Sequence, residues 1–273
     1  RLSVGSFSSI LAKLAMATSI QFSAPVASTM IVLVFTLRHI LAAHADVKYL
    51  SDTYLAFRCA PNEKFAPNGT YQANLARLLS RLPGEVSRTG FAAVSAGNDR
   101  QNDEVHVLAQ CRGDLGHGDC SKCVVNASRD APKSCTNAKG AVIWYDACLL
   151  KYAPRPFFGQ IDLLNRMALT NVMTLTDSLN FVDGVDAFLR GLVVQAANST
   201  ARYADGESAV CEYLTLYSFV QCTRDLNGGA CRRCLGYAVA ALPYVSGLKQ
   251  GGRVYFGSCE VRYEIYQTVA TQM

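Results

Sequence analysis

The strongest constraint on this chain is a cysteine pattern that occurs twice. Four cysteines are each followed by another cysteine 111 residues later, which gives the pairs Cys111 and Cys222, Cys120 and Cys231, Cys123 and Cys234, and Cys148 and Cys259. Neighbouring residues recur at the same offset, including Gln110 with Gln221 and Gly140 with Gly251. Self-similarity at a fixed period indicates a repeated structural unit. The sequence therefore predicts two related domains of about 105 residues each.

The first 45 residues differ from the rest of the chain. They contain no Asp or Glu and include an apolar run over Met30–Leu37. This run is shorter than the roughly 20 residues that a membrane-spanning helix needs, and residues 43–45, Ala-His-Ala, have the pattern of a signal peptidase site. We therefore expect residues 1–45 to be a secretory leader. Residues 46–156 and 157–273 are then expected to form the first and second domains.

The charge and the cysteine content indicate a secreted protein without a nucleic-acid partner. Outside the leader the chain carries 23 Lys and Arg against 21 Asp and Glu, and no basic cluster with interleaved aromatic residues remains. All 11 cysteines lie after the leader, as expected for an oxidising compartment. Asn68, Asn126 and Asn198 stand in Asn-x-Ser/Thr sequences and are candidate glycosylation sites.

The repeated C-x8-C-x2-C spacing is compatible with three chemistries. Each repeat contains a C-x-x-C pair, but a thiol-exchange enzyme places such a pair without competing cysteines, and here further cysteines lie at fixed distances. Zinc needs four ligands per site, and the two histidines after the leader, His106 and His117, are not repeated. Structural disulfides suit the expected compartment and are the interpretation that the residues favour, with redox chemistry and zinc as alternatives.

The same residues give little material for catalysis. The sequence contains no Gly-x-Ser-x-Gly and no phosphate-binding glycine loop, and two histidines offer few candidates for a general base. We expect no catalytic residues, no metal and no cofactor, and we expect the protein not to be an enzyme.

Hydrophobic periodicity predicts the same elements in both repeats. Leucine and aromatic residues recur at helical spacing over residues 71–82 and 181–192, and a second helix is expected after Cys120 and after Cys231. Runs rich in β-branched and aromatic residues predict strands over residues 91–94, 105–111, 142–145, 149–152, 213–221, 253–256 and 261–266. The predicted fold class is α+β, with two tandem disulfide-stapled domains that each pack an antiparallel sheet against two helices.

In the first repeat, cysteines follow 12 and 25 positions after the C-x8-C-x2-C group. This spacing resembles the plant ginkbilobin-like (stress-antifungal) domain, which is found in tandem in cysteine-rich repeat secretory proteins, and the resemblance covers residues 50–268. It implies the disulfides Cys59–Cys135, Cys111–Cys120, Cys123–Cys148, Cys222–Cys231 and Cys234–Cys259. The second repeat lacks the long bridge, because Thr170 and Ser246 stand at or near the equivalent positions.

One cysteine, Cys211, is left over from this framework. The residues allow two interpretations: a buried free thiol packed beside the strands, or a cysteine that forms a bridge to another molecule.

The resemblance also implies a mannose-binding site built from an Asn, an Arg and a Glu. In the second repeat these positions correspond to Asn171, Arg253 and Glu264, whose side chains offer several donors and acceptors to sugar hydroxyls. The alternative is that Arg253 and Glu264 form a cross-strand ion pair on the sheet. The first repeat has Ala60, Val142 and Ala153 at these positions, so no such site is expected there.

The function implied by the resemblance is that of a secreted, apoplastic carbohydrate-binding and antifungal defence protein. Its partner would be a mannose-type glycan of the cell wall or of a fungus, bound by the second domain. The alternative is a non-catalytic interaction or sensing ectodomain, related to cysteine-rich receptor-like kinases or plasmodesmata-located proteins. Its partners would be a membrane receptor or like domains. We expect no membrane span within this chain, and a plasma-membrane or plasmodesmal location only if the protein continues beyond Met273.

Overall fold

The computed structural model describes residues 53–175, 181–211 and 214–267, so the expected leader lies outside the described residues. The elements of the first repeat are β1 (Tyr54–Cys59), α3 (Thr70–Val86), β2 (Phe91–Ala96), a short 3-10 helix (Asp99–Gln101), β3 (Val105–Cys111), α4 (His117–Ser134), β4 (Ala141–Tyr145) and β5 (Cys148–Ala153). Those of the second repeat are β6 (Arg166–Thr170), α5 (Phe181–Asn198), β7 (Tyr203–Cys211), β8 (Leu214–Cys222), α6 (Gly228–Ser246), β9 (Gly251–Phe256) and β10 (Cys259–Glu264).

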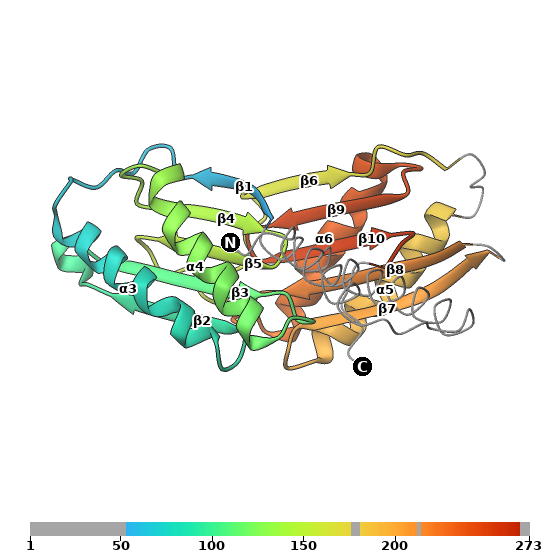
Figure 1. The fold of residues 1–273 in the computed structure, drawn as a ribbon, viewed down its shortest axis with the longest axis horizontal. Coiled ribbons are helices and arrows are strands. Elements are labelled where there is room, and N and C mark those ends of the chain that lie inside the picture. Colours follow the sequence, from blue (N-terminus) through green and yellow to red (C-terminus); the bar gives the residue numbers. More distant parts are fainter. Residues whose placement is uncertain (1–52, 176–180, 212–213, 268–273) are drawn as a thin grey trace, which may run out of the picture. The chain divides into compact units, whose positions relative to one another are not determined.

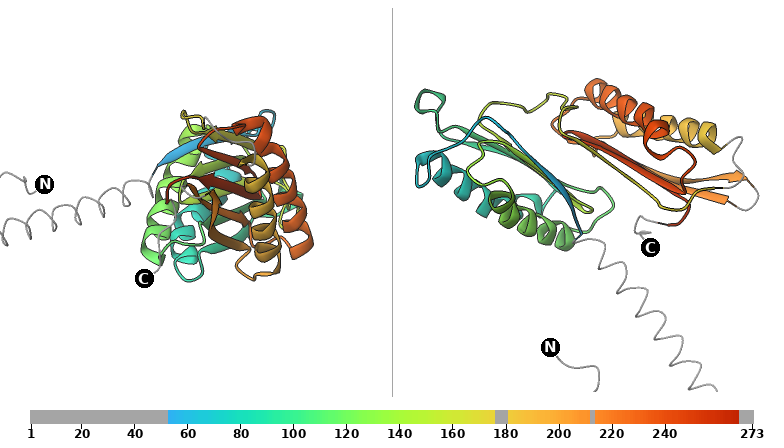
Figure 2. Two further views of the ribbon diagram at one scale, coloured as in Figure 1. Left: turned by 90° about the vertical axis from the view of Figure 1, so that its right-hand side faces the viewer. Right: turned by 90° about the horizontal axis from the view of Figure 1, so that it is seen from above.

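The two repeats share one topology (Figure 1). Each forms a five-stranded antiparallel sheet, in the order β1-β4-β5-β3-β2 for the first and β6-β9-β10-β8-β7 for the second. Each sheet carries its two helices on one face (Figure 2). The predicted α+β fold of two tandem, disulfide-stapled domains is therefore confirmed.

The helices form because their apolar residues recur on one side. In the first repeat the buried side of α3 consists of Tyr71, Leu75, Leu78, Leu79, Leu82 and Val86. In the second repeat the buried side of α5 includes Phe181, Val185, Leu189 and Leu192. Both stripes belong to the cores between helices and sheets, as the 3.6-residue periodicity predicts.

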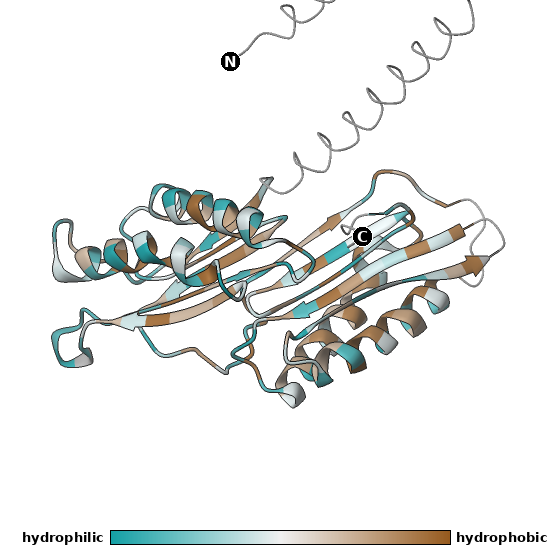
Figure 3. Ribbon diagram, turned by 60° about the horizontal axis from the view of Figure 1, so that its bottom comes forward, coloured by the Kyte–Doolittle hydropathy of each residue, from teal (hydrophilic) through white to brown (hydrophobic). Residues whose placement is uncertain are grey.

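Strand residues alternate between the helix-facing core and the opposite face of the sheet. On β9 and β10, Val254 and Tyr263 lie in the core with the helices, whereas Tyr255 packs with Val142 and Trp144 of the first repeat. The strand ribbons in Figure 3 change repeatedly between hydrophobic and hydrophilic colours, which reflects this alternation. The helix-free faces of the two sheets therefore contact each other.

Three strands were not predicted from the sequence: β1, β6 and β7. All three lie at sheet edges. Residues of β1 and β6 are mostly exposed or half-buried, so they lack the apolar alternation that identifies a strand. Backbone pairing with β4, β9 and β8 places them in the sheets.

The structure contains five disulfides that tie helices to strands, and they are the pairs that the family resemblance implies: Cys59–Cys135, Cys111–Cys120, Cys123–Cys148, Cys222–Cys231 and Cys234–Cys259. Neither C-x-x-C pair is bonded to itself. In the second repeat, Ser246 packs against Gly252, which is the β9 partner of Thr170. Ser246 thus packs closely against the sheet at the position where the first repeat has its long bridge.

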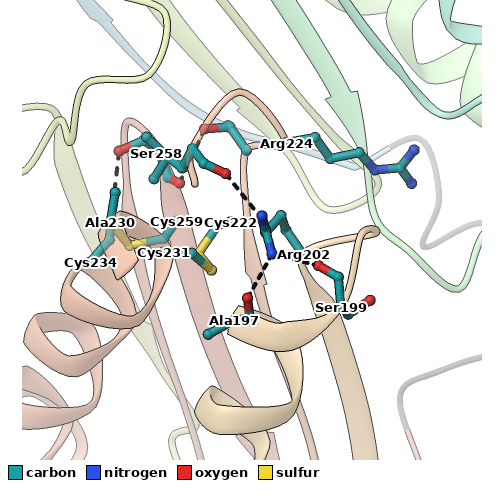
Figure 4. The surroundings of a disulfide bond; sticks show 12 residues. Ala197, Ser199, Arg202, Cys222, Arg224, Ala230, Cys231, Cys234, Ser258 and Cys259 are labelled. Atoms are coloured by element: carbon teal, nitrogen blue, oxygen red, sulfur yellow. Dashed lines mark hydrogen bonds between the residues drawn. A yellow bond between two sulfur atoms is a disulfide. The ribbon is translucent and has the colours of Figure 1, made fainter. Parts of the chain in front are cut away.

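The Cys222–Cys231 disulfide lies beside a capped helix end (Figure 4). Arg202 donates hydrogen bonds from Nη1 to the carbonyls of Ala197 and Ser199, at 2.6 and 2.7 Å, and so satisfies the last turn of α5. Its own carbonyl accepts a bond from the amide of Cys222. This arrangement fixes the end of α5 to the strand that holds the disulfide.

Candidate functional site

The expected sugar-binding residues Arg253 and Glu264 lie next to each other on β9 and β10. Arg253 Nε is 3.3 Å from Glu264 Oε1, so the two form the ion pair that the alternative interpretation predicts. The pair is largely enclosed, because the side chains are only 16% and 4% exposed. The sheet register explains the proximity: Arg253 is paired with Arg262, and Glu264 with Gly251.

Glu264 fits into this position because residue 251 has no side chain. A Cβ atom on Gly251 would lie 1.6 Å from Glu264 Oε2. The carboxylate therefore lies directly over the glycine backbone. Its Oε1 contacts both Arg253 and Arg262, whereas its Oε2 is buried and has no hydrogen-bond partner among the described residues.

Asn171 lies at the same end of the sheet. Its amide donates to the carbonyl of Gly251 at 3.0 Å, and in the first repeat the amide of Ala60 donates to the carbonyl of Gly140. This matching bond shows that Asn171 is the structural equivalent of Ala60. Its side-chain Oδ1 accepts a bond from the amide of Met173 at 2.9 Å.

Asp146 belongs to the first repeat and contacts two arginines of the second repeat. It stands in the turn between β4 and β5, and its Oδ1 accepts a 2.7 Å bond from Arg253 and lies 3.4 Å from Arg262. Its Oδ2 accepts a 2.8 Å bond from Arg112, which also binds Asp114. We call the three arginines and three carboxylates joined in this way the Asp146 cluster: Arg112, Asp114, Asp146, Arg253, Arg262 and Glu264.

The electrostatics of the cluster follow from burial and from the neighbouring charges. Burial and the adjacent Arg253 lower the pKa of Arg262. Burial opposes protonation of Arg253, but Tyr255, Asp146 and Glu264 raise the pKa of its guanidinium. Glu260 is a further acid beside the cluster, and burial raises its pKa to about 7 although Arg112 acts in the opposite direction. Among the described residues Glu260 forms no ion pair, although Arg112, Arg262 and Arg253 act on its pKa from nearby.

Hydrogen bonds between the repeats follow an approximate two-fold symmetry. Gln110 Nε2 donates to the carbonyl of Cys222 at 2.7 Å, and Gln221 Nε2 donates to the carbonyl of Cys111 at 2.8 Å. Their Oε1 atoms accept from the amides of Arg224 and Gly113 in the same reciprocal way. The contact between the repeats thus resembles the self-complementary interface of a symmetric dimer.

The sequence did not reveal these inter-repeat contacts. The recurrence of Gln110 as Gln221 was visible, but it carried no information about which groups the two side chains bind. Asp146 had no signal at all, because its equivalent in the second repeat is Gly257. The carboxylate of Asp162 lies close to Gly257 and pairs with Lys151 at 2.6 Å.

The remaining predicted residues are placed individually. Of the first-repeat equivalents of the sugar site, Val142 is buried against Tyr255 and Ala60 packs near Gly140. Among the three sequons, Asn68 and Asn198 are exposed, and Asn126 is half-buried in the middle of α4. Cys211 ends β7, and its side chain is not among those described.

The described residues include neither a candidate membrane span nor a candidate metal site. In the ranges 53–175, 181–211 and 214–267, no helix has both the length and the hydropathy of a membrane span. Within the same ranges, no group of three or more His, Cys, Asp or Glu is arranged to hold a metal ion.

Comparison with known proteins identifies the family. The model of the salt stress response/antifungal family matches residues 58–155 and 169–266. Cysteine-rich repeat secretory protein 38 of Arabidopsis thaliana is 40% identical over 81% of this chain and 88% of its own length. An antimicrobial ginkbilobin-2-like protein of Castanea crenata is 39% identical over 77% of this chain and 87% of its own length.

A solved structure shows the same tandem arrangement. The tandem DUF26 ectodomain of the Arabidopsis thaliana cysteine-rich receptor-like protein PDLP8 superimposes with a TM-score of 0.69 at 25% identity, and covers 79% of this chain and all of that one. Together, the repeated disulfide pattern, the shared topology and these matches show that the chain belongs to the salt stress response/antifungal (DUF26) family, as a tandem two-domain member.

Proposed function

We propose that the chain acts outside the cell as a non-catalytic recognition protein of the plant defence type, in which the two repeats form one binding unit. The observation that carries this proposal is the bond from Arg253 to Asp146 across the repeats. This bond engages Arg253, whose side chain a mannose site would need. The family includes both secretory proteins and receptor-like ectodomains, which supports a role in recognition.

The proposal includes processing during export. In this proposal residues 1–45 are removed during export. Asn68 and Asn198 carry glycans, because both side chains are exposed. The half-buried Asn126 is in a helix whose next two side chains, Ala127 and Ser128, point into the protein. We therefore leave Asn126 out of the proposed glycosylation sites.

A mannose-type glycan at the second repeat is the second candidate function. It is favoured by one observation: Asn171, Arg253 and Glu264 come together at one end of the sheet, around Gly251. The antimicrobial name of the Castanea crenata relative is compatible with this candidate. A sugar would have to draw Glu264 or Arg253 away from the Asp146 cluster.

The experiment uses the full chain secreted from plant cells, so that any leader is removed during export. Labelled protein is bound to washed fungal hyphae and to immobilised mannan, with and without excess mannose. We expect binding to hyphae that mannose does not displace. Asn171→Ala serves as the test variant for the sugar site, because its half-buried side chain lies outside the Asp146 cluster.

Two outcomes would change these conclusions. Displacement by mannose, together with loss of mannan binding in Asn171→Ala, would replace the first proposal by the second candidate. A secreted chain that binds neither hyphae nor mannan would overturn both.

A further inference from the structure

The outward side of α6 carries an unusual row of residues. Arg233, Tyr237, Ala240 and Tyr244 follow one another at helical spacing and are all exposed. Tyr237 is 56% exposed and Tyr244 91% exposed. With a rise of 1.5 Å per residue, the two tyrosines stand about 10.5 Å apart along the helix. The small residue between them leaves both rings open to a ligand.

This row carries positive charge that no acidic group of the described residues pairs with. Helix α6 contains no Asp or Glu, and it has two adjacent arginines, Arg232 and Arg233. Both are exposed, and within the described part of the chain neither has an ion pair or a side-chain hydrogen bond. Free guanidinium groups beside exposed aromatic rings fit a ligand that is both anionic and ring-shaped.

The first repeat provides an internal comparison. The equivalent positions on α4 are Lys122, Asn126, Arg129 and Lys133. The three cations among them lie 3.0 to 3.9 Å from Asp119 or Asp130. In the first repeat each cation on this side of the helix therefore has an acidic partner, and none of the four positions is aromatic. The tyrosines and the unpaired arginines are specific to the second repeat.

A shallow depression runs beside the row, between α5 and α6. It has a volume of about 170 Å³ and is lined by Arg190, Val194, Arg232 and Gly236, among others. Arg190 is already bound to Asp186 at 2.6 Å, so Arg232 is the available cation at its edge. We call this depression, together with Arg233, Tyr237 and Tyr244, the α6 track.

We propose that the α6 track binds an acidic polysaccharide, a chain of pyranose rings that carry carboxylates. Tyrosine faces pack against the apolar faces of sugar rings, and the arginine fork binds a carboxylate through two parallel hydrogen bonds. An open, linear track suits an extended chain better than a single enclosed sugar. This inference rests on the proposed function only in that the chain acts outside the cell, and the α6 track is a different surface from the Asp146 cluster.

The test uses the full secreted chain and polygalacturonate as the probe, with neutral mannan as the comparison. Affinity electrophoresis should show retardation by polygalacturonate that weakens with added salt. Tyr237→Ser combined with Tyr244→Ser should weaken binding about tenfold, which corresponds to roughly 1.4 kcal/mol. Arg232→Gln combined with Arg233→Gln should weaken it at least as much and reduce the salt dependence.

A matched control comes from α4. Lys122→Gln combined with Lys133→Gln removes two charges at the equivalent positions and should leave binding unchanged. All six substitutions affect exposed side chains, so thermal unfolding should not change, and this is checked for each protein. Equal loss in the α4 variant would mean that net charge alone governs binding, and would overturn the proposal.

Other outcomes decide the ligand class. Polyglutamate and vesicles containing phosphatidylserine are run beside polygalacturonate. If either binds more tightly through the same four residues, the ligand is an acidic protein or a membrane, and the proposed class is wrong. A chain that binds hyphae but not polygalacturonate would keep the proposed function and lose this inference.

Discussion

At the scale of single residues, Gly251 and Glu264 depend on each other. The carboxylate of Glu264 occupies the space that a side chain at position 251 would fill. In the first repeat the corresponding residues are Gly140 and Ala153, and the nearest atom to a Cβ on Gly140 is 3.2 Å away. The second repeat therefore needs a glycine at a place where the first repeat has more room.

This difference gives a matched pair of variants. Gly251→Ala should push Glu264 away from Arg253 and Arg262 and lower the free energy of unfolding by roughly 1–3 kcal/mol, as expected for overpacking. Gly140→Ala should cost less than about 1 kcal/mol, because only small shifts are needed. Urea unfolding of both variants checks this. Equal costs would contradict the role assigned to Glu264.

Glu260 makes stability depend on pH. Burial raises its pKa from 4.5 to about 7, so between these values the folded protein keeps a proton that the unfolded chain has lost. The free energy of unfolding should therefore fall as the pH rises through this window, by up to about 3 kcal/mol. Glu260→Gln cannot titrate and should flatten the dependence. Urea unfolding from pH 4.5 to 7.5 measures it, and an unchanged slope in the variant would contradict the assignment.

At the scale of elements, the two repeats hold their first strands differently. Cys59–Cys135 ties β1 to the end of α4 and closes a loop with a sequence separation of 76 residues. In the second repeat β6 has no disulfide and is held by backbone pairing with β9. The edge strand of the first repeat should therefore depend on its covalent bridge.

Removing that bridge tests this dependence. Cys59→Ser combined with Cys135→Ser should cost about 4–5 kcal/mol on the chain-entropy model, and should make β1 accessible to proteases. As a control, Cys111→Ser combined with Cys120→Ser opens a loop with a separation of only 9 residues and should cost about 3 kcal/mol. A larger loss from the short bridge than from the long one would contradict the model.

At the scale of the whole molecule, the repeats behave as a fused symmetric pair. Reciprocal bonds from Gln110 and Gln221 and the central carboxylate of Asp146 hold the two sheets face to face. The single tryptophan, Trp144, is buried in this interface, where its Nε1 donates to the carbonyl of Phe256 at 3.3 Å. Its fluorescence therefore reports on the contact between the repeats.

Asp146→Asn should weaken that contact selectively. The substitution leaves three arginines without their shared carboxylate, and removing one partner of a buried charge network costs about 3–5 kcal/mol. In the variant, Trp144 fluorescence should change at lower urea than the far-ultraviolet circular dichroism, whereas the two transitions coincide in the parent protein. Coincident transitions in the variant would show that the cluster does not hold the repeats together. Asp119→Asn, on the exposed side of α4, is the control.

The repeat, the four helices of the described residues and most of the strands could be predicted from the sequence. These depend on local periodicity and on cysteine spacing, both of which can be read along the chain. The edge strands β1, β6 and β7 were not predicted, because backbone pairing with a neighbouring strand positions them rather than a pattern of their own side chains. The offset that placed Asn171 opposite Ala60 agrees with their matching backbone bonds, whereas a role for Asn171 in sugar binding stays a prediction.

The contacts of Arg253 and Glu264, by contrast, could not be predicted from the sequence and follow from the packing of the two sheets. Arg253 binds Asp146, which lies 107 residues away in the sequence and in the other repeat. The role of a charged side chain depends on the groups that it contacts. Here the packing of the two sheets places Asp146 next to Arg253. Sequence spacing singled out Arg253 and Glu264 as candidate residues, whereas the fold places Arg253 in a bond to the other repeat and Glu264 beside it.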